Sequence, residues 1–188
     1  MKMKAKQVTL KNGTAVTLKS VNESEADLVL QFMKTVFSET DNLSLTADEV
    51  AALDLDTEQE ILLDYEKARG KIMLAAYLDE AIIATCSVQG ISDKTKYSHR
   101  AELGIAVKKE FWKQGLGSAL LSTALDFADK VGYAQLELET ANDNVNAIIL
   151  YNKFGFEAVG NIPRAQKTDG KYRDFIKFVK FMDTKDKE

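Results

Sequence analysis

The sequence predicts a single α+β domain over residues 1–188, with a mixed, mostly antiparallel central sheet of about six to seven strands flanked by about four to five helices. Segments with the alternating apolar pattern of β-strands occur near residue 10 and throughout the second half, and amphipathic helical segments separate them. Short turn signals join two pairs of strands, which favours antiparallel neighbours. At 188 residues, without a linker, repeat or low-complexity segment, the chain fits one hydrophobic core.

The first elements are a hairpin and a helix. Strands over residues 8–10 and 15–18 flank Asn12 and Gly13, a pair that tolerates the positive φ angles of a tight hairpin turn. A helix over residues 23–37 follows, because its apolar residues recur every three or four positions after an asparagine that can cap it. The chain therefore begins with two strands and one amphipathic helix.

An acidic helical segment comes next. A capping box at Thr46 opens one short helix, and a second helix begins at Thr57 and ends near Gly70. Solvated helix faces explain most acidic clusters of this kind, and attraction of a cationic ligand is the alternative. Residues 39–66 contain no Lys or Arg and ten acidic residues, namely Glu39, Asp41, Asp48, Glu49, Asp54, Asp56, Glu58, Glu60, Asp64 and Glu66.

The second half alternates strands with two helices. Strands over 72–78 and 81–88 are joined by Asp79 and Glu80 as a second hairpin. A helix over 115–131 carries an apolar stripe at helical spacing. The remaining elements are strands over 100–107, 135–139, 156–159 and 175–182 and a short helix over 144–154, with Pro163 in the loop between the last two strands.

Composition excludes several classes of function. Cys86 is the only cysteine and His99 the only histidine, so a disulfide, a cysteine cluster and a paired-histidine metal site are excluded. A net charge of −4 argues against a general nucleic-acid binder. No apolar run reaches the roughly 20 residues that span a membrane, and the start lacks an apolar signal core. We expect a cytoplasmic protein with no metal and no membrane partner.

A glycine-containing loop before the helix at 115 suits an anion. Gly115 and Gly117 lie where the first backbone amides of that helix have no internal partner, and the helix dipole favours negative charge there. The Walker sequence requires a lysine between its last glycine and Ser118, which is missing. The dinucleotide motif requires a third glycine where Leu120 stands, and seven residues, 108–114, separate strand from glycine. Both alternatives are disfavoured.

Two segments carry a more specific pattern. The loop reads Trp112-Lys-Gln-Gly115-Leu-Gly117, which is similar to Gln/Arg-x-x-Gly-x-Gly/Ala apart from the tryptophan. The segment from Asn144 to Phe156 matches Asn-x-x-Ala-x-x-Leu-Tyr-x-x-x-Gly-Phe at every defined position. With these two motifs the chain resembles the GNAT superfamily of acetyl-CoA-dependent N-acetyltransferases. The resemblance is specific over residues 100–160, which it identifies as the cofactor-binding core.

The resemblance implies that acetyl-CoA is the acyl donor and that no metal takes part. Backbone amides near Ala106 and Val107 should stabilise the oxyanion, and a bulge at Gly104 would free them. The cofactor-binding residues that it implies are Ile105, Ala106, Val107, Trp112, Lys113, Gln114, Gly115, Leu116, Gly117, Ser118, Asn144 and Tyr151.

The resemblance further implies direct attack of a neutral amine, without an acyl-enzyme. Tyr151 holds the family's tyrosine position and should donate a hydrogen bond to the leaving thiolate, because a phenol of pKa about 10 is a weaker acid than a thiol near 8.5. Glu102 resembles the glutamate that acts as general base, and His99 is a rival. Cys86 lies in an apolar strand and is expected to be a core thiol.

The acceptor implied is a primary amine of a small molecule or peptide, and the acidic segment favours a cationic one. In this family the acceptor site lies between the helices after the first strand and a late loop, here residues 22–70 and 161–172. The resemblance also allows a homodimer. The alternative functions are a non-catalytic CoA-binding regulator and, less favoured, a dinucleotide-dependent oxidoreductase.

Overall fold

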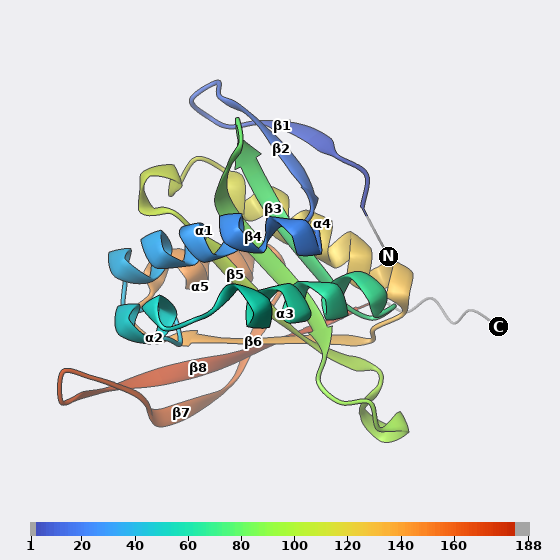
Figure 1. Cartoon of the computed structure of the whole chain (residues 1–188). Helices are drawn as coiled ribbons and strands as arrows, with labels where there is room; N and C mark the ends of the chain where they lie inside the picture. Colours follow the sequence, from blue (N-terminus) through green and yellow to red (C-terminus); the bar gives the residue numbers. More distant parts are fainter. Residues whose placement is uncertain (1–2, 183–188) are drawn as a thin grey trace.

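Eight strands form one sheet in the order β1-β2-β3-β4-β5-β6-β8-β7, and all neighbours are antiparallel except β5 and β6 (Figure 1). The computed structural model describes residues 3–182, so the first two and last six residues of the expected domain lie outside it. The predicted α+β fold is confirmed, with eight strands and five α-helices in the described residues. No helix within residues 3–182 is long and apolar enough to cross a membrane.

The elements agree in type and order with those that the sequence predicts. The strands are β1 (Lys6–Thr9), β2 (Ala15–Ser20), β3 (Ile72–Leu78), β4 (Ala81–Gly90), β5 (Arg100–Val107), β6 (Gln135–Ala141), β7 (Glu157–Thr168) and β8 (Lys171–Phe181). The α-helices are α1 (Ala26–Glu39), α2 (Ala47–Ala51), α3 (Leu55–Lys67), α4 (Leu116–Val131) and α5 (Val145–Lys153).

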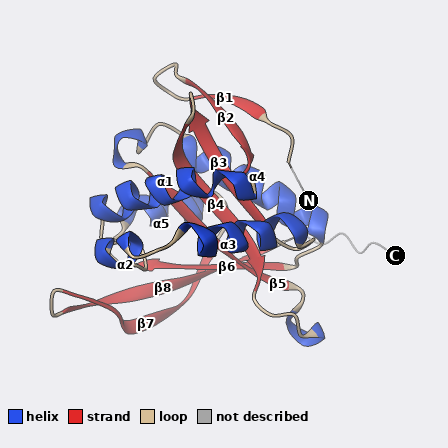
Figure 2. Ribbon diagram, viewed as in Figure 1, coloured by secondary structure: helices blue, strands red, loops and turns tan. Residues whose placement is uncertain are grey.

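Helices cover both faces of the sheet (Figure 2). On one face lie α1, α2 and α3, and a core that includes Phe32 of α1 and Leu62 of α3 packs on β3 and β4. On the other face lie α4 and α5, where Leu120 of α4 is fully buried in the larger core. Burial of these apolar stripes supplies the main stabilising term of the fold.

The strands β5 and β6 separate along their length. Their parallel pairing is limited to Arg100–Gln135, Ala101–Leu136 and Glu102–Glu137, although β5 runs on to Val107. The register between β4 and β5 is regular, so the bulge predicted at Gly104 is wrong. The backbone groups of β5 on the β6 side are released by the divergence of the two strands, and not by an inserted residue.

Several element boundaries differ from the prediction, most of all in the last two strands, which end at Thr168 and start at Lys171. Pro163 lies inside β7, and not in a loop, because β7 is an edge strand whose register with β8 shifts between Ile162 and Gln166. A proline that cannot donate to the ladder is tolerated at such a position. The helix α3 starts at Leu55, earlier than predicted, since the Asp54 side chain accepts from the backbone amide of Thr57 and caps it.

Candidate active site

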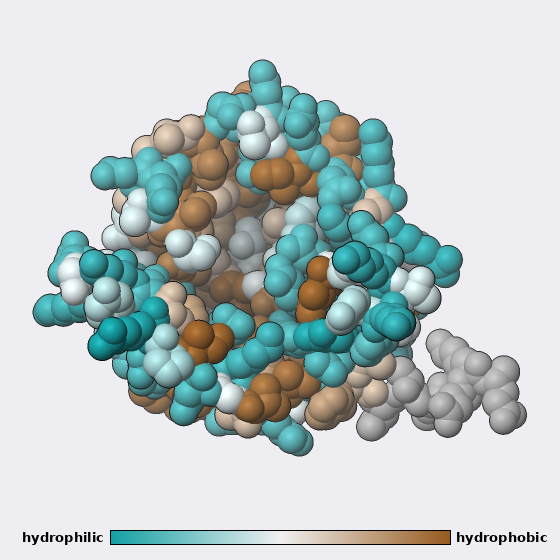
Figure 3. Space-filling view, turned by 90° about the horizontal axis from the view of Figure 1, so that it is seen from below, coloured by the Kyte–Doolittle hydropathy of each residue, from teal (hydrophilic) through white to brown (hydrophobic). Residues whose placement is uncertain are grey.

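A cavity of about 820 Å³ opens where β5 and β6 separate. Its size suits a ligand as large as a nucleotide cofactor. The molecule is visibly hollowed on the face seen from below, with apolar side chains inside the hollow and hydrophilic ones at its rim (Figure 3). Ten of the twelve predicted cofactor-binding residues line the cavity, namely Ile105, Ala106, Val107, Trp112, Lys113, Gly115, Gly117, Ser118, Asn144 and Tyr151.

The start of α4 forms one wall of this cavity. Gly115 is the N-cap with φ +91° and no side-chain cap, so the first amides of the helix receive no hydrogen bond from a capping side chain. Lys113 also has a positive φ of 61°, and a loop of this conformation is typical of anion-binding backbone concavities. A Cβ at Gly117 would lie 3.1 Å from Leu150 Cδ2, so α4 and α5 approach each other closely at this glycine.

Two predicted residues do not line the cavity. Leu116 is 1% exposed and packs in the core under α4. Gln114 has a structural contact instead, because its carbonyl oxygen accepts from the backbone amide of Lys11 over 3.0 Å. The turn between β1 and β2 therefore supports the glycine loop, and Lys11 itself lines the cavity.

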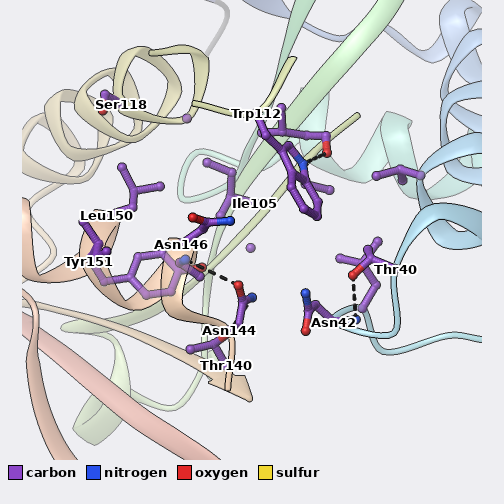
Figure 4. Close-up of a pocket in the computed structure, with 18 of the residues that line it drawn as sticks. Thr40, Asn42, Ile105, Trp112, Ser118, Thr140, Asn144, Asn146, Leu150 and Tyr151 are labelled. Atoms are coloured by element: carbon purple, nitrogen blue, oxygen red, sulfur yellow. Dashed lines mark hydrogen bonds between the residues drawn. The ribbon is translucent and has the colours of Figure 1, made fainter. Parts of the chain in front are cut away.

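Trp112 replaces the usual polar residue of the motif, and its indole has a defined partner. The Nε1–H group donates to the carbonyl oxygen of Val107 over 2.7 Å (Figure 4). This bond joins the glycine loop to the end of β5, because Val107 is the last residue of that strand. The indole donor is therefore used within the protein, and the ring forms part of the cavity wall.

The helix α5 supplies a second wall, beside the start of α4 (Figure 4). The Asn144 side chain caps α5 by accepting from Ala147 N and donates to Thr140 Oγ1 over 3.1 Å. Tyr151 is 6% exposed, and its ring packs on Phe156 and Phe178. Burial raises the pKa of the Tyr151 phenol, and the nearby Cys86 adds to this shift.

Sequence reasoning did not single out the loop that forms the third wall. Thr40, Asn42, Leu43 and Ser44 line the cavity between α1 and α2. They lie within residues 22–70, which the family resemblance assigned to the acceptor side, but no local motif distinguishes them. Their positions depend on tertiary contacts, since Gln166 Nε2 in β7 donates to the carbonyl oxygen of Leu43 over 3.1 Å.

The predicted general base lies outside the large cavity. Glu102 lines a smaller cavity of about 380 Å³ that adjoins the large one, and its carboxylate accepts from Gln89 Nε2 over 2.7 Å. His99, the rival base, lines neither cavity and uses its carbonyl oxygen to accept from Ala134 and Gln135. No group of three or more potential metal ligands occurs within residues 3–182.

The only cysteine is inaccessible to a substrate. Cys86 is 1% exposed on β4, and burial raises the pKa of its thiol to about 12. A thiol in this state forms almost no thiolate near neutral pH. The buried position of Cys86 agrees with the core thiol that the sequence predicts.

Comparisons with known proteins agree on one protein family. The model of the acetyltransferase (GNAT) family matches residues 38–156. Human N-acetyltransferase 8B is 30% identical over 102 residues, which are 54% of this chain and 45% of that protein. The L-amino acid N-acetyltransferase AaaT of Escherichia coli K12 is 28% identical over 102 residues, which are 54% of this chain and 62% of AaaT. The matched region thus spans about half the length of these relatives.

Solved structures share the fold. The acetyltransferase of the GNAT family from Streptococcus pneumoniae superimposes with a TM-score of 0.85 and 27% identity, over 89% of this chain and 99% of that chain. YncA, a putative acetyltransferase from Salmonella typhimurium solved with its cofactor acetyl-CoA, gives a TM-score of 0.78 at 16% identity, over 90% of this chain and 95% of that chain. With the family model matching more than half of its residues, the chain belongs to the acetyltransferase (GNAT) family.

Proposed function

We propose that residues 1–188 form one catalytic domain that transfers an acetyl group from acetyl-CoA to a primary amine of a small molecule or peptide. This proposal rests mainly on the charge of the large cavity. Among residues 3–182, three lysines (Lys11, Lys113 and Lys153) and only one acidic residue, Glu139, line it in a protein whose net charge is −4. A cavity of this kind favours a polyanion with an apolar arm, which describes acetyl-CoA.

The cavity walls fit the parts of acetyl-CoA. The uncapped amides at the start of α4, with Lys113 beside them, would hold the diphosphate. The unpaired edge of β5 from Leu103 to Val107 would hydrogen-bond the amide groups of the pantetheine arm, with Asn144 on the facing wall. The thioester would then lie near Tyr151.

The reaction needs two proton movements and one acyl transfer. The amine nitrogen attacks the thioester carbon, a C–N bond forms and the C–S bond breaks, so the amine loses one proton and the thiolate gains one. Free amides of β5 near Ala106 would stabilise the developing oxyanion. Tyr151, whose pKa burial raises, donates a hydrogen bond to the thiolate and keeps its own proton, so water supplies the proton that the thiolate gains. The inaccessible Cys86 supports direct attack without an acyl-enzyme.

We assign removal of the amine proton to Glu102, directly or through water. Its side chain lies in the smaller cavity, which shares Leu103 and Gly104 with the large one. A carboxylate beside the junction of the two cavities is in reach of an amine that enters from the smaller one, with one water molecule as relay.

The only tryptophan of the chain makes the first test direct. Trp112 lines the large cavity, so acetyl-CoA should change its fluorescence with a saturable titration, whereas NADH should leave the free energy of unfolding unchanged. Binding at 100 times the dissociation constant should also raise the free energy of unfolding by about 2.7 kcal/mol. Release of free thiol from acetyl-CoA on addition of a primary amine would then demonstrate transfer. No response to acetyl-CoA in either binding assay would overturn the proposal.

The two alternative functions give different results in the same assays. A CoA-binding regulator would show the fluorescence change without thiol release with any amine. A dinucleotide-dependent oxidoreductase would respond to NADH instead of acetyl-CoA.

A further inference from the structure

The two adjoining cavities have opposite charge. The large cavity is lined by three lysines and one glutamate, whereas the smaller cavity is lined by three glutamates, Arg100 and Lys177. Leu103, Gly104 and Glu139 line both, so they mark the junction. If the cationic cavity holds acetyl-CoA, the smaller cavity is where an acceptor meets the acetyl group.

Both cations of the smaller cavity are engaged by one buried carboxylate. Glu137 is 3% exposed, and its oxygens lie 2.5 Å from Arg100 Nε and 2.9 Å from Lys177 Nζ. Burial opposes ionisation of Glu137, but Arg100 and Lys177 outweigh it and lower its pKa to about 2. Glu137 thus offsets one of the two positive charges and occupies Arg100 Nε and Lys177 Nζ.

The other two glutamates face the cavity with weaker partners. Glu102 is exposed and held by the neutral amide of Gln89, which in turn accepts from the Tyr65 hydroxyl over 3.1 Å. Glu139 is 43% exposed and lies 3.7 Å from Lys177, which is closer to Glu137. Two negative side chains therefore remain at the cavity wall, one of them at the junction.

The acidic helical segment does not supply this charge. None of its ten acidic residues lines either cavity. Several have local partners instead: Asp54 caps α3, Glu49 closes the capping box of α2, and Glu39 accepts from the backbone amide of Lys109 over 2.7 Å. A preference for cationic acceptors must arise from the strands β5 and β6.

We propose that the smaller cavity binds the acceptor and that Glu102 and Glu139 select a diamine-type substrate, with a second cationic group beside the reacting amine. This inference rests on the proposed acetyl transfer. A second ammonium group would be attracted by the two glutamates, while the carboxylate of an amino acid would be repelled by them.

Three amines of matched length test the substrate class: 1,4-diaminobutane, butylamine and 4-aminobutanoate. They share the reacting amine and differ only in the group at the far end. We expect kcat/KM to fall in that order, by at least about tenfold from the first to the last. High salt should reduce the difference, because charge attraction in a water-exposed cavity is screened.

Substitution of Glu139, the glutamate at the junction of the two cavities, tests whether this residue causes the preference for a diamine. Glu139→Gln should reduce the ratio of kcat/KM between diaminobutane and butylamine by about fivefold. Glu157→Gln, on β7 and outside both cavities, is the matched control and should leave the ratio unchanged. Glu102→Gln should also reduce the ratio, and its separate role as base would lower kcat for all three amines.

The outcomes separate this inference from the proposed function. If acetyl-CoA neither changes Trp112 fluorescence nor releases thiol, both fail. If thiol is released but 4-aminobutanoate reacts as well as diaminobutane, or if Glu139→Gln leaves the ratio intact, the substrate class is wrong and acetyl transfer stands. Binding of acetyl-CoA without transfer to any of the three amines would also overturn the substrate class.

Discussion

The guanidinium of Arg173 donates a hydrogen bond to the side-chain oxygen of Asn42 over 2.8 Å, although 131 positions separate them in the chain. It also donates to the carbonyl oxygen of Asp41 over 2.7 Å and forms an ion pair with Asp143. Asn42 lines one wall of the large cavity, and Asp143 immediately precedes Asn144 on the facing wall. One side chain of β8 therefore joins the two rims of the cavity.

We predict that Arg173→Lys weakens acetyl-CoA binding by about fivefold. An ammonium group cannot reach all these acceptors, so the loop with Asn42 would be less ordered in the free protein and binding would have to order it. Titration of Trp112 fluorescence measures the change. Arg164→Lys is the control, since Arg164 lies in the same hairpin with its guanidinium over the Tyr172 ring, 5.1 Å from the centroid. Equal effects of the two substitutions would show that Arg173 does not hold the loop.

The two glycines that bound α4 allow a matched test of the anion site. Gly115 has φ +91° at the start of the helix, and Gly132 has φ +92° just after its end. Replacement of either by alanine places a side chain in the left-handed region, which costs about 1–2 kcal/mol of stability. Only Gly115→Ala should also weaken acetyl-CoA binding, by about tenfold, since only Gly115 precedes the phosphate-binding amides.

Denaturant unfolding measures the stability of both variants, and titration with acetyl-CoA measures their affinity. A similar loss of stability with a selective loss of affinity in Gly115→Ala supports the site at the helix start. If both variants bind acetyl-CoA like the parent protein, the phosphates bind elsewhere.

Local signals in the sequence account for the elements that were predicted well. The helix α4 has glycines with positive φ at both ends, and the alternation on β5 correctly places Ala101 and Leu103 in the core. The bulge predicted at Gly104 is wrong for a reason outside the local sequence. The strand β5 pairs with β6 only as far as Glu102, and the two strands then diverge. Pairing between segments this far apart leaves no pattern within either one.

The same limit applies to the candidate site. The glycine loop and the α5 motif are local, and most of their residues line the cavity as expected. The loop with Asn42 depends on Arg173, and the charge of the smaller cavity depends on which carboxylate pairs with Arg100 and Lys177. The sequence shows that these charges exist, but only the sheet register brings them together.

A buried carboxylate in α3 makes stability depend on pH. Glu58 is 6% exposed, its carboxyl group has no hydrogen bond or ion pair to a residue within 3–182, and burial raises its pKa from 4.5 to about 7. Between these pH values the folded protein holds the proton more tightly than the unfolded chain, so stability falls as the pH rises through this range. Glu58→Gln should therefore stabilise the protein by about 1–3 kcal/mol at pH 8 and change little at pH 4.5.

Urea unfolding of Glu58→Gln at both pH values checks this prediction. Glu60→Gln, an exposed change on the same helix, serves as the control and should have a small effect at both. A gain in stability of the same size at pH 4.5 and pH 8 would contradict a burial effect on ionisation, because the stabilisation would then come from packing.

Replacement of Tyr151 tests its role toward the leaving group. The ring is held by Phe156 and Phe178, so Tyr151→Phe should keep the fold and bind acetyl-CoA within about twofold of the parent protein. Loss of the hydroxyl donor should lower kcat by about 10- to 100-fold. Because burial raises the pKa of this phenol, the parent enzyme should show no loss of kcat from tyrosine ionisation up to pH 10. An unchanged kcat in Tyr151→Phe would show that the hydroxyl does not act as a donor, and an alkaline decline below pH 10 that this substitution removes would show that the pKa of the phenol is not raised.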